Sequence, residues 1–122
     1  NPVINAFFDE IDKYVKYMNE TCFTSITGYE FHYAFYEEGS FYKRHLDQFK
    51  DNKGRAFSMI MYLNNNWQEG DGGELCVYLE DEKKIISPNF GRCVFFKSCE
   101  LEHEVLPSNK KRLSITGWLK VG

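Results

Sequence analysis

Two histidines and one aspartate are the strongest candidates for metal chemistry in this sequence. His45 and Asp47 are separated by one residue, and side chains at positions i and i+2 of a strand point to the same face. A third ligand must come from another strand, and we expect His103 rather than His32, because His32 lies in a run of aromatic residues. Two imidazoles and one carboxylate on one face of an ion are typical of non-haem iron(II) sites, which keep positions open for a cosubstrate and O2. Taken alone, the His-x-Asp spacing fits a solvated turn as well.

A basic residue downstream of His103 suggests an anion site. Residues 107–111, between His103 and Arg112, are rich in turn formers, so we expect a hairpin with Arg112 opening its second strand. An inward Arg112 needs an anion, because a buried unpaired guanidinium is costly, and a dicarboxylate cosubstrate would supply one. Tyr62 could add a hydroxyl donor to the same carboxylate. Without the metal ligands, the preferred interpretation would be that Arg112 is a charge at the rim of the domain and Tyr62 an aromatic residue of the core.

The elements that would position these residues are expected to be one helix followed by strands. Apolar side chains recur with helical spacing over residues 3–18. The rest of the chain consists of short runs of β-forming residues separated by turn residues. The expected strands span residues 26–36, 41–46, 56–63, 74–79, 83–87, 92–97, 102–106 and 112–119. This pattern favours a mainly β fold, a two-sheet jelly roll with a flanking N-terminal helix.

Length and composition indicate one folded domain over residues 1–122. The 122 residues are 43% hydrophobic and 17% aromatic, which is enough apolar material for a core. The net charge of −3 argues against nucleic acid or an anionic membrane as a partner. No apolar run approaches the ~18 residues that a membrane span needs. Because the chain starts at Asn1, we expect a fragment or a trimmed product.

The cysteines give an expectation about the cellular compartment. Cys22, Cys76, Cys93 and Cys99 form no Cys-x-x-Cys pair, so a zinc site has little support. A disulfide framework is not needed in a domain of this size. We expect reduced, structural cysteines and a cytoplasmic location.

Six further motifs occur in a characteristic order over roughly residues 30–120. They are FYKRHLD (41–47), YLN (62–64) with Trp67, GGEL (72–75), PNFGR (88–92) with FF (95–96), HEV (103–105) with Pro107, and RLSITGW (112–118). In these motifs the chain resembles the prolyl 4-hydroxylase branch of the 2-oxoglutarate oxygenases. The pattern is most similar to the oxygen-sensing prolyl hydroxylases and their bacterial relatives. Collagen-type enzymes have Lys where this chain has Arg112.

The resemblance implies a double-stranded β-helix and a set of residue roles. His45, Asp47 and His103 would be the iron ligands, and Arg112, helped by Tyr62, would bind the distal carboxylate of 2-oxoglutarate. Other implied positions are Tyr36 and Thr116 lining the cosubstrate pocket, Leu75 and Val105 as its apolar walls, Trp118 as an aromatic near the iron, and Arg55 on the substrate side of the entrance.

The activity that the resemblance implies is that of an Fe(II)- and 2-oxoglutarate-dependent dioxygenase. It would use O2 to hydroxylate a prolyl residue of a protein, with release of succinate and CO2, and ascorbate is a candidate reductant. Asp47 excludes the halogenases of the superfamily, which have a small residue at that position. Two alternatives stay open: the same chemistry on a free amino acid or small molecule, and a non-catalytic metal-binding β-barrel.

Two arginines are candidates for contacts with a polypeptide substrate. Such a substrate needs an open groove beside the iron, whereas a small molecule needs burial on nearly all sides. Arg55 and Arg92 could bind backbone groups in such a groove. The alternative is that both are solvated surface charges, because most arginines are exposed.

Overall fold

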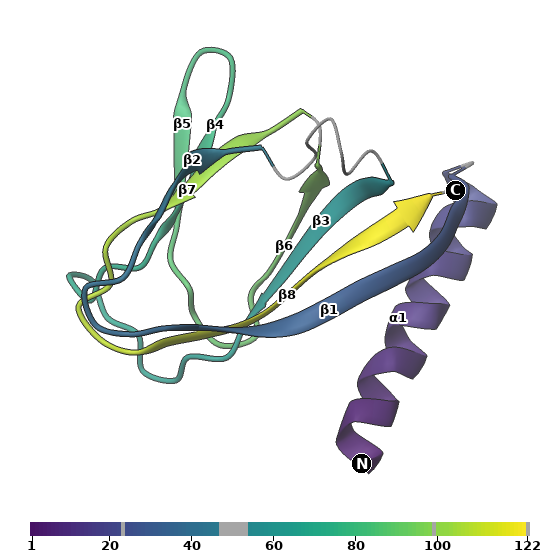
Figure 1. The fold of residues 1–122 in the computed structure, drawn as a ribbon, viewed down its shortest axis with the longest axis horizontal. Coiled ribbons are helices and arrows are strands. Elements are labelled where there is room, and N and C mark those ends of the chain that lie inside the picture. The colour runs from purple at the N-terminus through teal and green to yellow at the C-terminus, as the bar shows by residue number, and fades with distance from the viewer. Residues whose placement is uncertain (23, 47–53, 99, 122) are drawn as a thin grey trace.

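The computed structural model describes residues 1–22, 24–46, 54–98 and 100–121. Within these ranges the chain forms one N-terminal helix and then strands in two antiparallel sheets (Figure 1). The elements are α1 (Pro2–Thr21), β1 (Ile26–Tyr36), β2 (Tyr42–His45), β3 (Arg55–Tyr62), β4 (Leu75–Tyr78), β5 (Lys83–Ile86), β6 (Cys93–Lys97), β7 (Glu102–Val105) and β8 (Arg112–Val121).

The strands form two four-stranded sheets that face each other. The order is β1-β8-β3-β6 in one sheet, called the major sheet here, and β2-β7-β4-β5 in the other, the minor sheet. Figure 1 shows the minor sheet across from the major sheet, with α1 on the outer side of the latter. The predicted mainly β fold, a jelly roll with a flanking N-terminal helix, is confirmed.

The space between the sheets holds an apolar core at one end. Alternation along β3 turns Ile60 and Tyr62 inward, where they pack with Leu75 and Val77 of β4 and with Phe96 of β6. Such alternation leaves the other side chains of the major sheet facing outward, toward α1.

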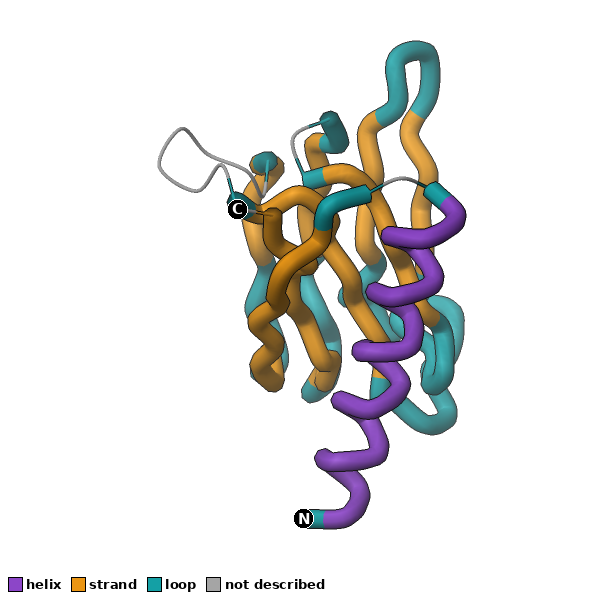
Figure 2. Tube along the Cα trace, turned by 90° about the vertical axis from the view of Figure 1, so that its right-hand side faces the viewer, coloured by secondary structure: helices purple, strands orange, loops and turns teal. Residues whose placement is uncertain are grey.

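The helix covers that outward face. Ile11 and Met18 of α1 are buried against Met59 and Leu119 of the major sheet. The side chain of Asn19 fixes the end of the helix to β1, because its amide donates to the Ile26 carbonyl and accepts from the Ile26 N–H, both at 2.9 Å. Figure 2 shows α1 running along the outside of the strands. In the part of the chain that the structure describes, no helix is long and apolar enough to cross a membrane.

The expected hairpin between His103 and Arg112 is wrong. β7 belongs to the minor sheet and β8 to the major sheet, so residues 106–111 cross from one sheet to the other. Pro107 has no N–H for a ladder, and its carbonyl accepts from Gly73 at 3.1 Å instead. As a result, His103 and Arg112 lie on facing walls of the sandwich.

Candidate metal and cosubstrate site

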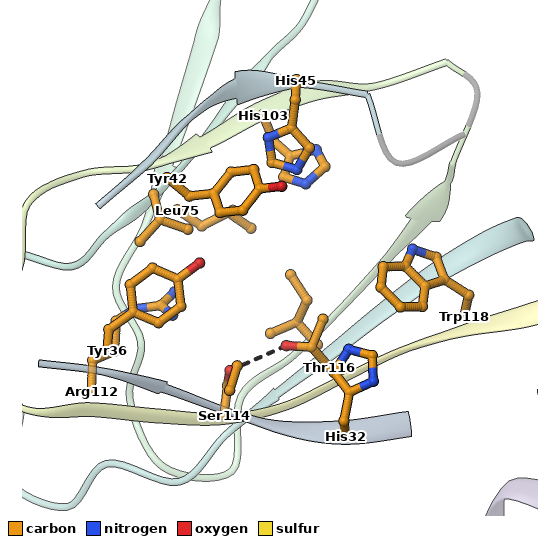
Figure 3. A pocket seen from close by; sticks show the side chains of 13 residues that line it. His32, Tyr36, Tyr42, His45, Leu75, His103, Arg112, Ser114, Thr116 and Trp118 are labelled. Atoms are coloured by element: carbon orange, nitrogen blue, oxygen red, sulfur yellow. Dashed lines mark hydrogen bonds between the residues drawn. The ribbon is translucent and has the colours of Figure 1, made fainter. Parts of the chain in front are cut away.

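A cavity of about 310 Å³ lies between the two sheets (Figure 3). Because side chains alternate between the two faces of a strand, alternate residues of β1 and β8 point into the cavity. The major sheet contributes His32, Ala34, Tyr36, Ile60, Arg112, Ser114, Thr116 and Trp118. The minor sheet side contributes Tyr42, His45, Leu75, His103 and Val105.

The two predicted histidine ligands meet in this cavity. His45 and His103 are direct partners in the β2–β7 register, and their ring centroids are 4.3 Å apart. The Nδ1 atom of His45 lies 2.7 Å from the Lys43 carbonyl, and that of His103 lies 3.1 Å from the Leu101 carbonyl. Because a carbonyl can only accept, Nδ1 is the donor in each pair and Nε2 keeps the lone pair that a metal needs.

The third predicted ligand cannot be placed. Asp47 lies outside the described residues, and within them no group of three or more metal-binding side chains occurs. Two imidazoles turned into one cavity are a donor set that suits Fe(II) and other divalent transition metals. The residues present therefore fit a metal ion bound between β2 and β7.

Arg112 is the main feature of the opposite wall. Its side chain is buried, with 2% of its surface exposed. Its Nε donates to the Gly73 carbonyl at 2.7 Å, and its guanidinium lies about 5 Å from the ring centroids of Tyr36 and Tyr62. Among the described residues, Nη2 has no hydrogen-bond partner. Burial lowers the pKa of Arg112 from its ordinary value, but a guanidinium stays charged at neutral pH, so this group is a buried cation that requires an anion.

Tyr62 provides a second unused donor beside Arg112. Its side chain is 1% exposed, and its hydroxyl makes no hydrogen bond of good geometry within the described residues. Burial raises the pKa of Tyr62 to about 12, although the charge of Arg112 opposes this rise. The phenol is therefore neutral at physiological pH and able to donate. Tyr62 lies beside Arg112, with its ring centroid 5.1 Å from the guanidinium carbon, and does not itself line the cavity.

The cavity as a whole fits a small dicarboxylate. The unsatisfied donor of Arg112 stands on one wall, with the Tyr62 ring beside it, and the imidazoles of His45 and His103 stand on the other. Leu75 and Val105 are apolar residues that also line the cavity. A dicarboxylate could place one end on the metal and the other on Arg112, and this is the binding mode expected of 2-oxoglutarate.

The predicted positions Tyr36, Thr116 and Trp118 also line the cavity. Tyr36 is the register partner of Arg112 in β1 and β8. Thr116 lies 3.2 Å from Ser114 through their hydroxyl oxygens. Trp118 is buried, and its indole N–H has no partner among the described residues. It is therefore free to donate to a molecule in the cavity.

The two substrate-side arginines are not brought together. The Arg55 guanidinium lies 3.7 Å from the centroid of the Trp118 ring and pairs with Glu30 at 2.9 Å, so it stacks on a cavity residue. Arg92 is exposed and donates to the Ser87 carbonyl and hydroxyl at 3.0 and 2.9 Å. Its carbonyl accepts from the N–H of Tyr62, at the other end of β3 from Arg55. This placement does not support the prediction that both arginines contact one substrate groove.

Five residues that line the cavity were not predicted from the sequence to be site residues. His32 and Ala34 alternate with Tyr36 on β1, and that alternation could have identified them. The others are Tyr42, Ile60 and Ser114. The Tyr42 ring contacts that of His45 in a tilted arrangement, with ring centroids 4.2 Å apart, and its place in the FYKRHLD motif was the available signal.

Comparison with known proteins identifies the family. The model of the 2OG-Fe(II) oxygenase superfamily matches residues 31–120. Mouse prolyl hydroxylase EGLN3 is 37% identical over 84 residues, which cover 66% of this chain and 35% of that protein. The prolyl 3-hydroxylase OGFOD1 of Xenopus laevis is 36% identical over 77 residues, which cover 54% of this chain and 15% of that protein. The chain thus spans about a third or less of the length of these relatives.

Solved structures agree with this result. A prolyl-4-hydroxylase from Pseudomonas putida superposes with a TM-score of 0.88 at 41% identity, covering 92% of this chain and 63% of that one. A prolyl hydroxylase from Trichoplax adhaerens, solved with a hypoxia inducible factor peptide fragment, superposes with a TM-score of 0.87 at 32% identity, covering 96% and 56%. The chain therefore belongs to the 2OG-Fe(II) oxygenase superfamily.

Proposed function

We propose that this chain is the oxygenase domain of an Fe(II)- and 2-oxoglutarate-dependent dioxygenase that hydroxylates a prolyl residue of a protein. The reaction converts 2-oxoglutarate, O2 and a C–H bond into succinate, CO2 and a C–OH group, and ascorbate serves as an accessory reductant. The observation that carries the proposal is the buried, unsatisfied Arg112 facing His45 and His103 across one cavity.

The histidines hold the metal, and Asp47 is proposed as the third ligand. The carbonyls of Lys43 and Leu101 fix the tautomers of His45 and His103, so that Nε2 of each faces the ion. Iron, when bound, supplies the activation of O2 and the oxidation of the C–H bond. The chain itself contributes orientation and charge.

The cosubstrate is bound by donor atoms that have no hydrogen-bond partner among the described residues, Nη2 of Arg112 and the hydroxyl of Tyr62. Arg112 pairs with the distal carboxylate of 2-oxoglutarate, and Tyr62 donates its hydroxyl to the same group. Leu75 and Val105 restrict water at the carbon chain, which strengthens these charge-assisted contacts.

A prolyl residue in a polypeptide is the proposed substrate. The supporting facts are the relatives named prolyl hydroxylases and a similar structure that contains a peptide fragment. Arg55, which stacks on the cavity residue Trp118, is proposed to contact the peptide. We propose hydroxylation at C4, the position in the name of the bacterial structure that is 41% identical.

Turnover of a peptide panel tests this proposal. The protein is incubated with Fe(II), 2-oxoglutarate and ascorbate, together with proline-containing peptides and free amino acids. We expect succinate formation that is stimulated by a peptide, with one added oxygen atom on proline in its mass spectrum. An added oxygen atom found only on free amino acids would show that the substrate is a free amino acid and not a polypeptide. The absence of succinate under every condition would contradict the proposed activity.

A further inference from the structure

The loop between β3 and β4 contacts the side chain of Arg112 through Gly73. Three of its glycines adopt a positive φ, with values of 95°, 77° and 67° for Gly70, Gly72 and Gly73. Other contacts hold the loop in place. The indole of Trp67 donates to the Gly72 carbonyl at 2.9 Å, and Lys110 pairs with Asp71 at 2.8 Å. The loop is thus fixed from two sides.

Gly73 is the residue of this loop that contacts Arg112. Its carbonyl accepts the Nε–H of Arg112 at 2.7 Å. A Cβ atom on Gly73 would lie 3.0 Å from Cδ of Arg112, 3.1 Å from Cζ2 of Trp67 and 3.2 Å from Oγ of Ser108. Each of these distances is tighter than an ordinary van der Waals contact.

The neighbours leave a methyl group no free direction. Trp67 and Ser108 are buried, and the Ser108 hydroxyl donates to the Lys110 carbonyl. Arg112 is buried as well and is not able to swing into solvent. Because packed interiors transmit such strain to their most adaptable part, the long side chain of Arg112 would shift.

We propose, building on the proposed function, that Gly73 is a positioning residue for the cosubstrate. The Gly73 carbonyl binds Nε of Arg112, and the absence of a Cβ on Gly73 leaves room for the Arg112 side chain. Trp67 and Ser108 pack against Gly73 and fix its position. The distance from Arg112 to the histidine wall in turn selects the length of dicarboxylate that can reach both. Gly73 therefore controls the affinity for the distal carboxylate and leaves the metal-chelating end of the ligand unaffected.

Gly70 provides a matched control within the same loop. Gly70 also has a positive φ, but a Cβ there would meet nothing within 4 Å. Gly70→Ala and Gly73→Ala therefore share the backbone strain of an L-residue in the left-handed region. They differ in the contacts of the new methyl group with Arg112, Trp67 and Ser108, which occur only at Gly73.

The test compares ligands with and without a distal carboxylate. Binding to the Mn(II)-loaded protein is measured by calorimetry for 2-oxoglutarate, N-oxalylglycine and oxalate. Relative to Gly70→Ala, we expect Gly73→Ala to weaken 2-oxoglutarate and N-oxalylglycine by about tenfold or more, as for a displaced charge-assisted contact. Affinities for oxalate and Mn(II) should match in the two variants.

Two results overturn the inference. One is equal 2-oxoglutarate affinity in the two variants, and the other is parallel weakening of oxalate, which would indicate general damage. If the unmodified protein binds Mn(II) but no 2-oxoglutarate at all, the proposed function fails instead, so the two failures are distinguishable.

A double variant keeps the test decisive if Gly73→Ala folds poorly, as judged by thermal unfolding. Trp67→Phe removes the Cζ2 atom that would lie 3.1 Å from the new methyl. In the Trp67→Phe, Gly73→Ala protein the methyl group gains room where Cζ2 of Trp67 would have crowded it. We expect 2-oxoglutarate affinity to return toward that of Trp67→Phe alone. A folded double variant that binds oxalate normally but 2-oxoglutarate no better than Gly73→Ala, or tenfold worse than Trp67→Phe, contradicts the inference.

Discussion

Arg112 and Tyr62 are polar groups that the folded chain buries without fully satisfying them. Both Nη2 of Arg112 and the hydroxyl of Tyr62 lack a hydrogen-bond partner among the described residues. An unsatisfied buried polar group costs roughly 1–3 kcal/mol, and more when it is charged. A bound carboxylate would remove this cost, and the site is therefore most stable when it is occupied.

Replacing Arg112 is expected to affect one ligand selectively. Arg112→Ala should weaken 2-oxoglutarate binding by about 3 kcal/mol, because it removes a charge-assisted contact in a buried site. Affinity for the metal should stay the same, since the histidines lie on the other wall. Calorimetry on the Mn(II)-loaded protein measures both. Arg92→Ala, which removes an exposed arginine bound to Ser87, is the control and should change neither.

Removing the Tyr62 hydroxyl should change 2-oxoglutarate affinity with little change in the stability of the ligand-free protein. Tyr62→Phe should lower 2-oxoglutarate affinity by about 1 kcal/mol, the usual worth of one hydrogen bond. The ligand-free protein should lose little stability, because the removed hydroxyl makes no hydrogen bond of good geometry among the described residues. Chemical unfolding without ligand measures this directly. A clear loss of stability in the variant would show that the hydroxyl has a structural partner.

The pKa of Tyr62 predicts a pH dependence at alkaline pH. Its folded-state value of about 12 exceeds the ordinary value of 10.0, so the folded state retains its proton longer than the unfolded chain. The contribution of the protonated Tyr62 hydroxyl to the free energy of unfolding is therefore present below pH 10 and is lost as the pH rises toward 12. The free energy of unfolding should fall less over this window in Tyr62→Phe than in the unmodified protein. Equal slopes in the two proteins would contradict the burial of an ionisable phenol.

The residues that could be predicted at this scale are the chemically distinctive ones. His45, His103 and Arg112 have types and positions that few other roles explain, and the cavity contains all of them. Tyr42 was missed for a structural reason. The β2–β7 register shifts between Tyr42 and His45, so two residues three apart both reach the cavity, which a strict period of two does not predict.

At the scale of elements, strand positions followed from local pattern but strand partners did not. The run expected at 26–36 is β1 (Ile26–Tyr36), and the short run at 41–46 contains β2 (Tyr42–His45). The pairing of His103 and Arg112 in one hairpin was wrong because neighbouring strands often, but not always, pair. The crossing of residues 106–111 between sheets depends on bonds to Gly73 and Glu74, which are distant in the sequence.

The two faces of the major sheet have separate tasks, and this separation is testable. Leu119 is fully buried under α1 on the outer face. Leu119→Ala should reduce the free energy of unfolding by about 2–5 kcal/mol, as for other buried leucines. The variant should nevertheless bind 2-oxoglutarate normally, since the even-numbered residues of β8 line the cavity. Comparing denaturant unfolding with calorimetry distinguishes the two effects, and a proportional loss of binding would indicate that the faces are coupled.

At the scale of the whole molecule, the proposed ligands join the two sheets. The metal would contact the minor sheet through His45 and His103, and the distal carboxylate would contact Arg112 in the major sheet. A ligand that binds only the folded state at a concentration of 100 times its Kd adds about 2.7 kcal/mol of stability. Mn(II) and 2-oxoglutarate should therefore each raise the melting temperature. In Arg112→Ala the increment from 2-oxoglutarate should disappear and that from Mn(II) should remain.

The most direct test of the central claim is an anaerobic titration of the Fe(II)-loaded protein with 2-oxoglutarate, followed by visible absorption. A 2-oxo acid chelated to Fe(II) gives a charge-transfer band, which reports metal and cosubstrate in one site. We predict a saturable band in the unmodified protein, its loss in His103→Ala, and its formation in Arg112→Ala only at higher 2-oxoglutarate concentrations. A band that is absent from the unmodified protein, or unchanged in His103→Ala, would contradict a shared site between the two sheets.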